Sequence, residues 1–168
     1  MPLAGKTLLV CGADQAAARA AAARAAAAAK DPTAPQLRAL LALKSALDRT
    51  NTLTSWTPAR GVNGGFCSTF AGVGFPGIKC DAGKNVIDIN LYQMNLSGTL
   101  PPAEVLVGLP RLIALDFSET GIRGMLPANW SQLVQLEDIR MSGNELLTGG
   151  AASGISVPVL MLLRHYHL

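Results

Sequence analysis

Residues 89–101 read INLYQMNLSGTLP, and residues 115–127 read LDFSETGIRGMLP. At an offset of 26 residues, the apolar, glycine and proline positions of the two segments coincide. A third segment, IRMSGNEL at residues 139–146, keeps the pattern at an offset of 24 residues, and an L-x-x-L spacing precedes both the second and the third segment. The chain from Val86 onward is therefore a series of repeated units of nearly constant length.

Each repeated unit predicts a short strand followed by a turn. Apolar and polar residues alternate at residues 87–91, 114–117 and 138–141, which is the pattern of a strand with one buried side. Gly98 and Gly124 follow at equivalent positions and allow a tight turn. A period of about 20–29 residues with leucines at L-x-x-L-x-L spacing is typical of leucine-rich repeats, whose strands stack as one parallel sheet. Such repeats bury their leucines only against neighbouring repeats.

An amphipathic helix is predicted before the repeats. Thr33 and Gln36 have the spacing of a capping box, in which each side chain bonds the other residue's backbone amide. Leucines then recur at helical intervals, so we expect about four helical turns ending near Arg49. The apolar side of this helix would cover the open end of the first repeat.

Three cysteines, at positions 11, 67 and 80, leave two interpretations open. Cys67 and Cys80 form a disulfide, or all three are unrelated buried thiols. Spacing alone does not decide between them, because one pair in 168 residues is not a disulfide-rich composition.

The repeats and the segment before them resemble the plant-type leucine-rich-repeat family. Residues 115–127 are similar to its repeat, L-x-L-x-x-N-x-L-x-G-x-I-P. Residues 40–56, Cys67 and residues 75–81 are together similar to its N-terminal cap, A-L-L-x-L-K-x-x-L…L-x-x-W…C…W-x-G-V-x-C. The segment LPANWS at residues 126–131 also resembles the L-P-x-x-W-S repeats of kinetoplastid surface antigens and algal repeat proteins.

The resemblance, which covers about residues 36–149, implies the fold class. It is an α/β repeat fold: a short right-handed leucine-rich-repeat solenoid with a parallel β-sheet on the concave face and an α-helical N-terminal cap. The resemblance also implies a disulfide between Cys67 and Cys80.

The family's turn asparagine, which hydrogen-bonds the backbone of neighbouring repeats, is present only at Asn144. Met94 and Thr120 take its place in the first two repeats. Because threonine donates one hydrogen bond and methionine none, we expect an incomplete polar ladder there.

The sequence divides into four segments. We expect an Ala/Arg leader or targeting segment at residues 1–32, a cap at 33–85, about three repeats at 86–149 and an irregular tail at 150–168. The leader is compatible with a signal peptide, an organellar transit peptide or a mispredicted start. The repeat pattern stops after residue 149, which suggests a truncated product or gene model.

The charge distribution argues against a nucleic-acid partner. The net charge of +3 lies in the first 30 residues, because the rest of the chain carries ten basic and ten acidic side chains. Phosphate binding needs a clustered excess of lysine and arginine. No apolar run approaches the ~18 residues of a membrane-spanning helix, so we expect no transmembrane segment in this chain.

Polar residues beside the buried strand positions are the candidate ligand-binding set. They are Asp88, Asn90, Tyr92 and Gln93 in the first repeat, Asp116, Ser118 and Glu119 in the second, and Asp138, Arg140 and Ser142 in the third. The alternative is a solvated face, in which Asp116 and Arg140 form a cross-strand ion pair worth under about 1 kcal/mol.

Other candidate sites are few. Asn95 and Asn129 begin N-x-S acceptor sequences for glycosylation. His165 and His167 are expected to be solvated tail residues and not metal ligands, because two ligands alone do not close a site. No catalytic constellation or cofactor motif stands out, so we predict a protein that is not an enzyme and needs no cofactor or metal.

We therefore expect an extracellular or cell-surface recognition module that binds a protein or peptide ligand, or a glycan. The alternatives are a fragment of a larger receptor-like repeat protein without independent activity, and an organelle-imported repeat protein.

Overall fold

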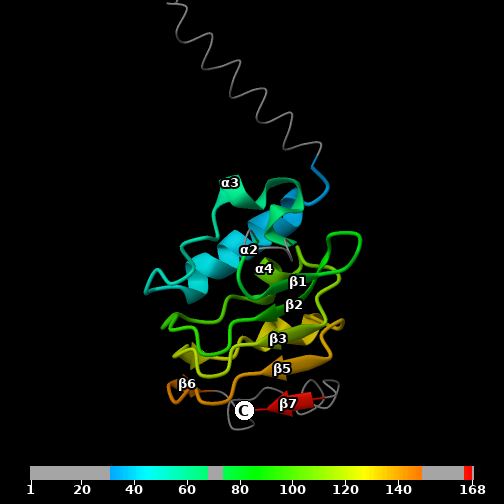
Figure 1. Ribbon diagram of the computed structural model, residues 1–168. Helices are drawn as coiled ribbons and strands as arrows, with labels where there is room; N and C mark the ends of the chain where they lie inside the picture. The colour runs from blue at the N-terminus through cyan, green and yellow to red at the C-terminus, as the bar shows by residue number, and fades with distance from the viewer. Residues whose placement is uncertain (1–30, 68–73, 149–164, 168) are drawn as a thin grey trace, which may run out of the picture. The chain divides into compact units, whose positions relative to one another are not determined.

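Helix α2 (Ala34–Leu47) is the first element of the computed structural model, which describes residues 31–67, 74–148 and 165–167 (Figure 1). Pro35 stands in its first turn, where the missing amide costs nothing. The buried side of α2 consists of Gln36, Leu37, Ala39, Leu40, Leu43 and Leu47. The expected helix is thus confirmed, although it ends two residues before Arg49, at an Asp48 cap. The leader's residues 1–30 lie outside the described residues.

The predicted capping box at the start of α2 does not form. The Thr33 side chain makes no capping hydrogen bond to the helix. Gln36 instead reaches across to the first repeat: its Oε1 accepts the Val86 amide at 2.8 Å, and its Nε2 donates to the Lys84 carbonyl at 3.1 Å. The capping-box prediction is wrong because a buried long-range partner competes successfully with the local one.

Replacing Gln36 with alanine is expected to destabilise the fold by about 2 kcal/mol, because the buried Val86 amide loses its acceptor. Urea unfolding of the variant measures the loss. Arg38→Ala, on the exposed side of the same helix, is the control and should change stability by less than about 0.5 kcal/mol. Equal stabilities of the two variants would contradict this role for Gln36.

The cap continues through two short helical segments and a disulfide. Helix α3 (Pro58–Gly61) leads into the 3-10 segment η1 (Val62–Cys67). Cys67 is bonded to Cys80 at the end of strand β1 (Ile78–Cys80), which confirms the implied bridge. The Trp56 and Phe75 rings of the cap stack with centroids 5.2 Å apart. Phe75 stands where the family's cap has its second tryptophan.

The strands of the repeats stack in chain order. Strand β1 pairs antiparallel with β2 (Val86–Asn90), and β2, β3 (Ala114–Asp116) and β5 (Asp138–Arg140) then follow in parallel (Figure 1). All three repeat strands lie within one residue of their expected bounds. Their buried central residues, Ile89, Leu115 and Ile139, are register partners.

Short elements on the return side complete each repeat. Helix α4 (Ala103–Leu106) and the 3-10 helix η2 (Ala128–Gln132) occupy equivalent places in successive repeats, and β4 (Gly124–Met125) pairs in parallel with β6 (Leu147–Thr148). Trp130 is buried in η2, and its indole donates to the Pro101 carbonyl at 2.8 Å. Neighbouring repeats are therefore joined on this side as well as through the sheet.

Asn144 makes the polar ladder that the family pattern implies. Its side chain is buried between the second and third repeats. Its Nδ2 donates to the carbonyls of Phe117 and Met141, and its Oδ1 accepts the amides of Thr120, Gly121 and Ile122. The Thr120 hydroxyl lies 2.6 Å from the Phe117 carbonyl oxygen and 3.2 Å from Asn144 Oδ1, so its one hydrogen is directed at these two acceptors. Between the first two repeats, the Leu96 amide bonds the Thr120 carbonyl instead of a side chain.

The end of the chain differs from the expected irregular tail. Residues His165–His167 form strand β7, which pairs in parallel with β5 as a further member of the sheet. Residues 149–164 and 168 lie outside the described residues. A missing repeat motif therefore did not exclude a strand, because backbone pairing needs no leucine pattern. Among the described residues, none of the helices has the length and apolar character to cross a membrane.

Candidate functional site

The sheet carries its polar residues in rows. The register places Asp88, Ala114 and Asp138 side by side in one row, and Asn90, Asp116 and Arg140 in the next. We call the polar side of β2, β3 and β5 the strand face. It comprises Asp88, Asn90, Tyr92, Gln93, Asp116, Glu119, Asp138, Arg140 and Ser142, all exposed or half-buried. Parallel stacking has thus brought together residues that are far apart in the sequence.

Ser118 does not belong to the exposed set that the sequence predicted. Its side chain is only 5% exposed, so it is not available to a ligand. The sequence pattern misplaced it because the chain turns directly after β3: the Ser118 amide bonds the Asp116 carboxylate at 3.0 Å, and its carbonyl accepts the Gln93 amide.

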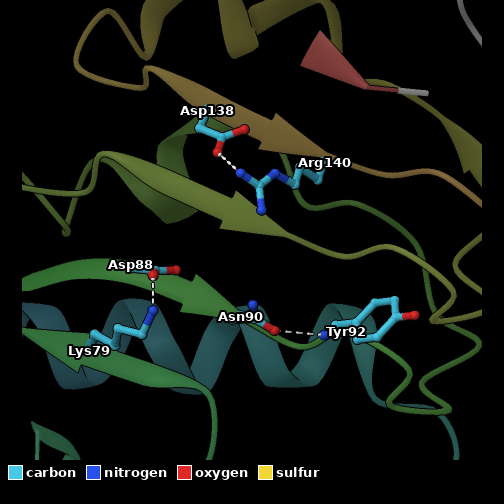
Figure 2. A network of polar contacts seen from close by, with 6 residues as sticks. All are labelled: Lys79, Asp88, Asn90, Tyr92, Asp138 and Arg140. Atoms are coloured by element: carbon cyan, nitrogen blue, oxygen red, sulfur yellow. Dashed lines mark hydrogen bonds and ion pairs between the residues drawn. The ribbon is translucent and has the colours of Figure 1, made fainter. Parts of the chain in front are cut away.

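The two basic residues of this region each pair with an aspartate (Figure 2). Lys79 on β1 lies opposite Asp88 in register, and its Nζ is 2.7 Å from Asp88 Oδ2. Arg140 Nη2 is 2.7 Å from Asp138 Oδ2 on the same strand. Because both cationic side chains are more than half exposed, each pair contributes under about 1 kcal/mol. The repeat pattern does not single out Lys79, because this residue precedes the repeats.

The expected ion pair between Asp116 and Arg140 is absent from this part of the structure. The two residues are register partners, as predicted. Arg140 nevertheless bonds Asp138, and the Asp116 carboxylate accepts the Ser118 amide. Asn90 accepts the Tyr92 amide at 3.1 Å in the same way (Figure 2). In both repeats, this side chain therefore accepts the backbone amide two residues further along the chain and closes the turn.

Tyr92, Gln93 and Glu119 form a polar cluster where the strands end. The Tyr92 hydroxyl donates to Glu119 Oε1 at 3.2 Å, and Gln93 Nε2 donates to Glu119 Oε2 at 2.9 Å. The hydrogen bond from the phenol to Glu119, together with the negative charges of Glu119 and Asp116, raises the pKa of Tyr92. One carboxylate therefore organises two neighbouring side chains of the previous repeat.

The pKa of Tyr92 gives a pH-dependent prediction. Because this pKa is higher in the folded than in the unfolded chain, its contribution to stability is complete below the ordinary value of 10.0 and is lost as the pH rises through the folded value. Glu119→Gln should bring the midpoint back toward the ordinary value. The experiment compares two proteins that both carry Tyr166→Phe, one with Glu119 and one with Glu119→Gln. Ultraviolet absorbance titration measures the midpoint of Tyr92 in each, and an unchanged midpoint would contradict the contact between Tyr92 and Glu119.

The two predicted glycosylation acceptors have different surroundings. Asn95 is exposed, and its Oδ1 accepts the Ser97 hydroxyl at 3.1 Å. The Asn129 side chain is half-buried and works as a cap: its Oδ1 accepts the Ala103 amide, and its Nδ2 donates to both carboxylate oxygens of Glu104 at 3.0 and 2.9 Å. A glycan on Asn129 would have to displace Glu104.

One depression lies away from the strand face. A shallow hollow of about 280 Å³ is bounded by α2 and α4. Its lining is Pro35, Arg38, Ala39, Ala42, Glu104, Val105 and Gly108. It contains none of the predicted ligand-binding residues.

Comparison with known proteins supports the resemblance seen in the sequence. Residues 33–81 match the family model of the leucine rich repeat N-terminal domain. The ectodomain of BIR2 from Arabidopsis thaliana is 31% identical over 66% of this chain, with a TM-score of 0.55. Residues 33–81 are therefore similar to a leucine rich repeat N-terminal domain, and the fold as a whole is similar to a receptor ectodomain. The resemblance seen in the sequence is confirmed by these matches.

A second solved structure is similar over a longer stretch of this chain. It is the ectodomain of the Arabidopsis receptor kinase HAESA in complex with an N-terminal extended IDA peptide hormone ligand; it is 25% identical over 79% of this chain, with a TM-score of 0.52. The chain spans about half of the BIR2 ectodomain (55%) and about a fifth of the HAESA ectodomain (20%). None of the curated proteins matches it.

Proposed function

We propose that the chain is an extracellular, receptor-like recognition module whose strand face binds a protein or peptide ligand. The observation that carries the proposal is the row arrangement: Asn90, Asp116 and Arg140 occupy one register line across three strands. An extended ligand laid across the strands would meet a different side chain on each. The proposed activity is binding, without a catalytic step.

The similar structures support this proposal. The HAESA ectodomain is a leucine-rich-repeat structure with a bound peptide hormone. By that likeness, we propose that the sheet of this chain lines the concave side of a right-handed solenoid. The Cys67–Cys80 disulfide supports an extracellular location, because disulfides persist in oxidising compartments.

Peptide display tests the proposed binding face. Extended peptides selected against the full chain should lose affinity about tenfold or more when Tyr92 and Arg140 are both replaced by alanine, as expected for central contact residues. The control is Val134→Ser, which changes a side chain that is 85% exposed outside the strand face. Selected peptides that bind the double variant normally would argue for a different surface.

We also propose that Asn95 carries the glycan if the chain passes through the secretory pathway. Peptide mass spectrometry of the protein from a eukaryotic secretory host should find glycan on Asn95, the exposed acceptor, and little on Asn129, whose amide is engaged by Glu104. Glycan on Asn129 alone would contradict this assignment. An unglycosylated native protein would favour import into an organelle.

A further inference from the structure

The strand face has an unbalanced charge. It carries the carboxylates of Asp88, Asp116, Glu119 and Asp138. Its own cation, Arg140, and Lys79 on the neighbouring strand β1 form ion pairs with Asp138 and Asp88. The remaining two carboxylates have neutral partners: Asp116 accepts a backbone amide, and Glu119 accepts a phenol and a carboxamide. Negative charge is thus left over beside the second repeat.

An exposed aromatic ring lies next to this surplus charge. Tyr92 is 46% exposed, although it is a large side chain. Its hydroxyl is bonded to Glu119, and Asp116 is the register partner of Asn90, two residues before Tyr92. The negative charges of both carboxylates contribute to the raised pKa of Tyr92. An aromatic ring beside carboxylates suits a cation, which gains from the ring face as well as from charge pairing.

The backbone holds this cluster in place. Gln93 and Glu119 both have left-handed backbone angles, with φ of 58° and 54°. Their amides bond the next repeat, Gln93 to the Ser118 carbonyl at 3.1 Å and Glu119 to the Ser142 carbonyl at 2.8 Å. At the equivalent position of the third repeat stands Gly143, where a Cβ would lie 2.8 Å from Glu119 Cγ. Glycine therefore leaves the room that the Glu119 side chain occupies.

We propose that Tyr92, Asp116 and Glu119 bind an arginine or lysine side chain of an extended peptide laid across the strand face. This inference rests on the proposed function and specifies its ligand as a cationic peptide. The carboxylates supply charge and hydrogen-bond acceptors, and the Tyr92 ring covers the cation. Arginine is preferred, because its planar guanidinium can contact a carboxylate and stack on a ring at once.

Nuclear magnetic resonance titration of the isotope-labelled full chain tests the proposal. The probe is a Gly/Ser peptide with arginine at alternate positions, so that an extended backbone presents all of them on one side. Its matched control has citrulline, which has the same shape without the charge, at each arginine. We expect backbone shifts at Tyr92, Asp116 and Glu119 with the arginine peptide and at least about tenfold weaker binding of the citrulline peptide.

Variants locate the cation. Glu119→Gln and Asp116→Asn, each of which removes one charge with little change in shape, should weaken the arginine peptide about three- to tenfold. Glu145→Gln removes the same charge from an exposed turn outside the strand face and should leave the affinity unchanged. Tyr92→Phe should bind nearly normally, whereas Tyr92→Leu should lose the contribution of the ring.

The outcomes separate this inference from the proposed function. Equal binding of both peptides on the strand face would overturn the cationic specificity and leave the recognition face standing. Shifts confined to residues outside the strand face would overturn both. A lack of response to the arginine peptide, or equal weakening by Glu145→Gln, would also overturn the cationic site.

Discussion

Replacing Asn144 with alanine is expected to destabilise the folded chain by about 3–5 kcal/mol, the largest effect of any single polar substitution considered. The side chain is only 8% exposed and satisfies backbone groups of two repeats at once. Alanine cannot replace these bonds. Each buried amide or carbonyl left without a partner costs about 1–3 kcal/mol, partly offset by local relaxation.

Chemical unfolding of the Asn144 variants measures the effect. Asn144→Asp keeps the acceptor for the three amides but loses the donor to Phe117 and Met141, so it should also be less stable than the native chain at neutral pH. Asn95→Ala, at an exposed turn, is the matched control and should change stability by less than about 0.5 kcal/mol. A loss of under about 1 kcal/mol for Asn144→Ala would contradict the ladder.

The double substitution Cys67→Ala and Cys80→Ala is expected to cost about 3 kcal/mol, because the bridge closes a loop of 13 residues in the unfolded chain. The disulfide also links η1 covalently to strand β1, the first strand of the sheet. The loss should therefore appear as weakened amide protection in the cap as well as in the overall free energy of unfolding.

Reduction provides an independent measurement of the same bond. The native chain should approach the stability of the double variant when dithiothreitol is added, and the double variant should not respond. Cys11→Ser is the control and should leave the response to reductant unchanged. A native chain that is equally stable with and without reductant would show that the bridge contributes nothing.

Repetition explains why much of the fold could be predicted. The buried positions of β2, β3 and β5 recur at fixed offsets, so the assignment of buried positions in each repeat is supported by the other two. The same regularity identifies Asn144 as the turn asparagine, because Met94 and Thr120 occupy the equivalent positions of the first two repeats. The predicted ligand-binding residues, apart from Ser118, are exposed or half-buried on the strand face for the same reason.

The remaining features depend on which of several partners a side chain finds. Gln36 could have capped its own helix, but its side chain accepts the buried amide of Val86 instead. Arg140 could have reached Asp116 across the strands, but Asp138 is nearer along its own strand, and the Asp116 carboxylate holds a turn. Strand β7 pairs with β5 through its backbone, and this pairing requires no apolar periodicity in the sequence.

Methyl–methyl nuclear Overhauser spectroscopy of the leucine- and isoleucine-labelled chain tests the stacked register most directly. Ile89 and Ile139 are each register partners of Leu115, on either side of it. We expect contacts from Leu115 to both isoleucines and a much weaker one or none between Ile89 and Ile139, which lie two strand spacings apart, about 9.6 Å. A spectrum in which Leu115 contacts neither isoleucine would contradict the stacking of the repeats.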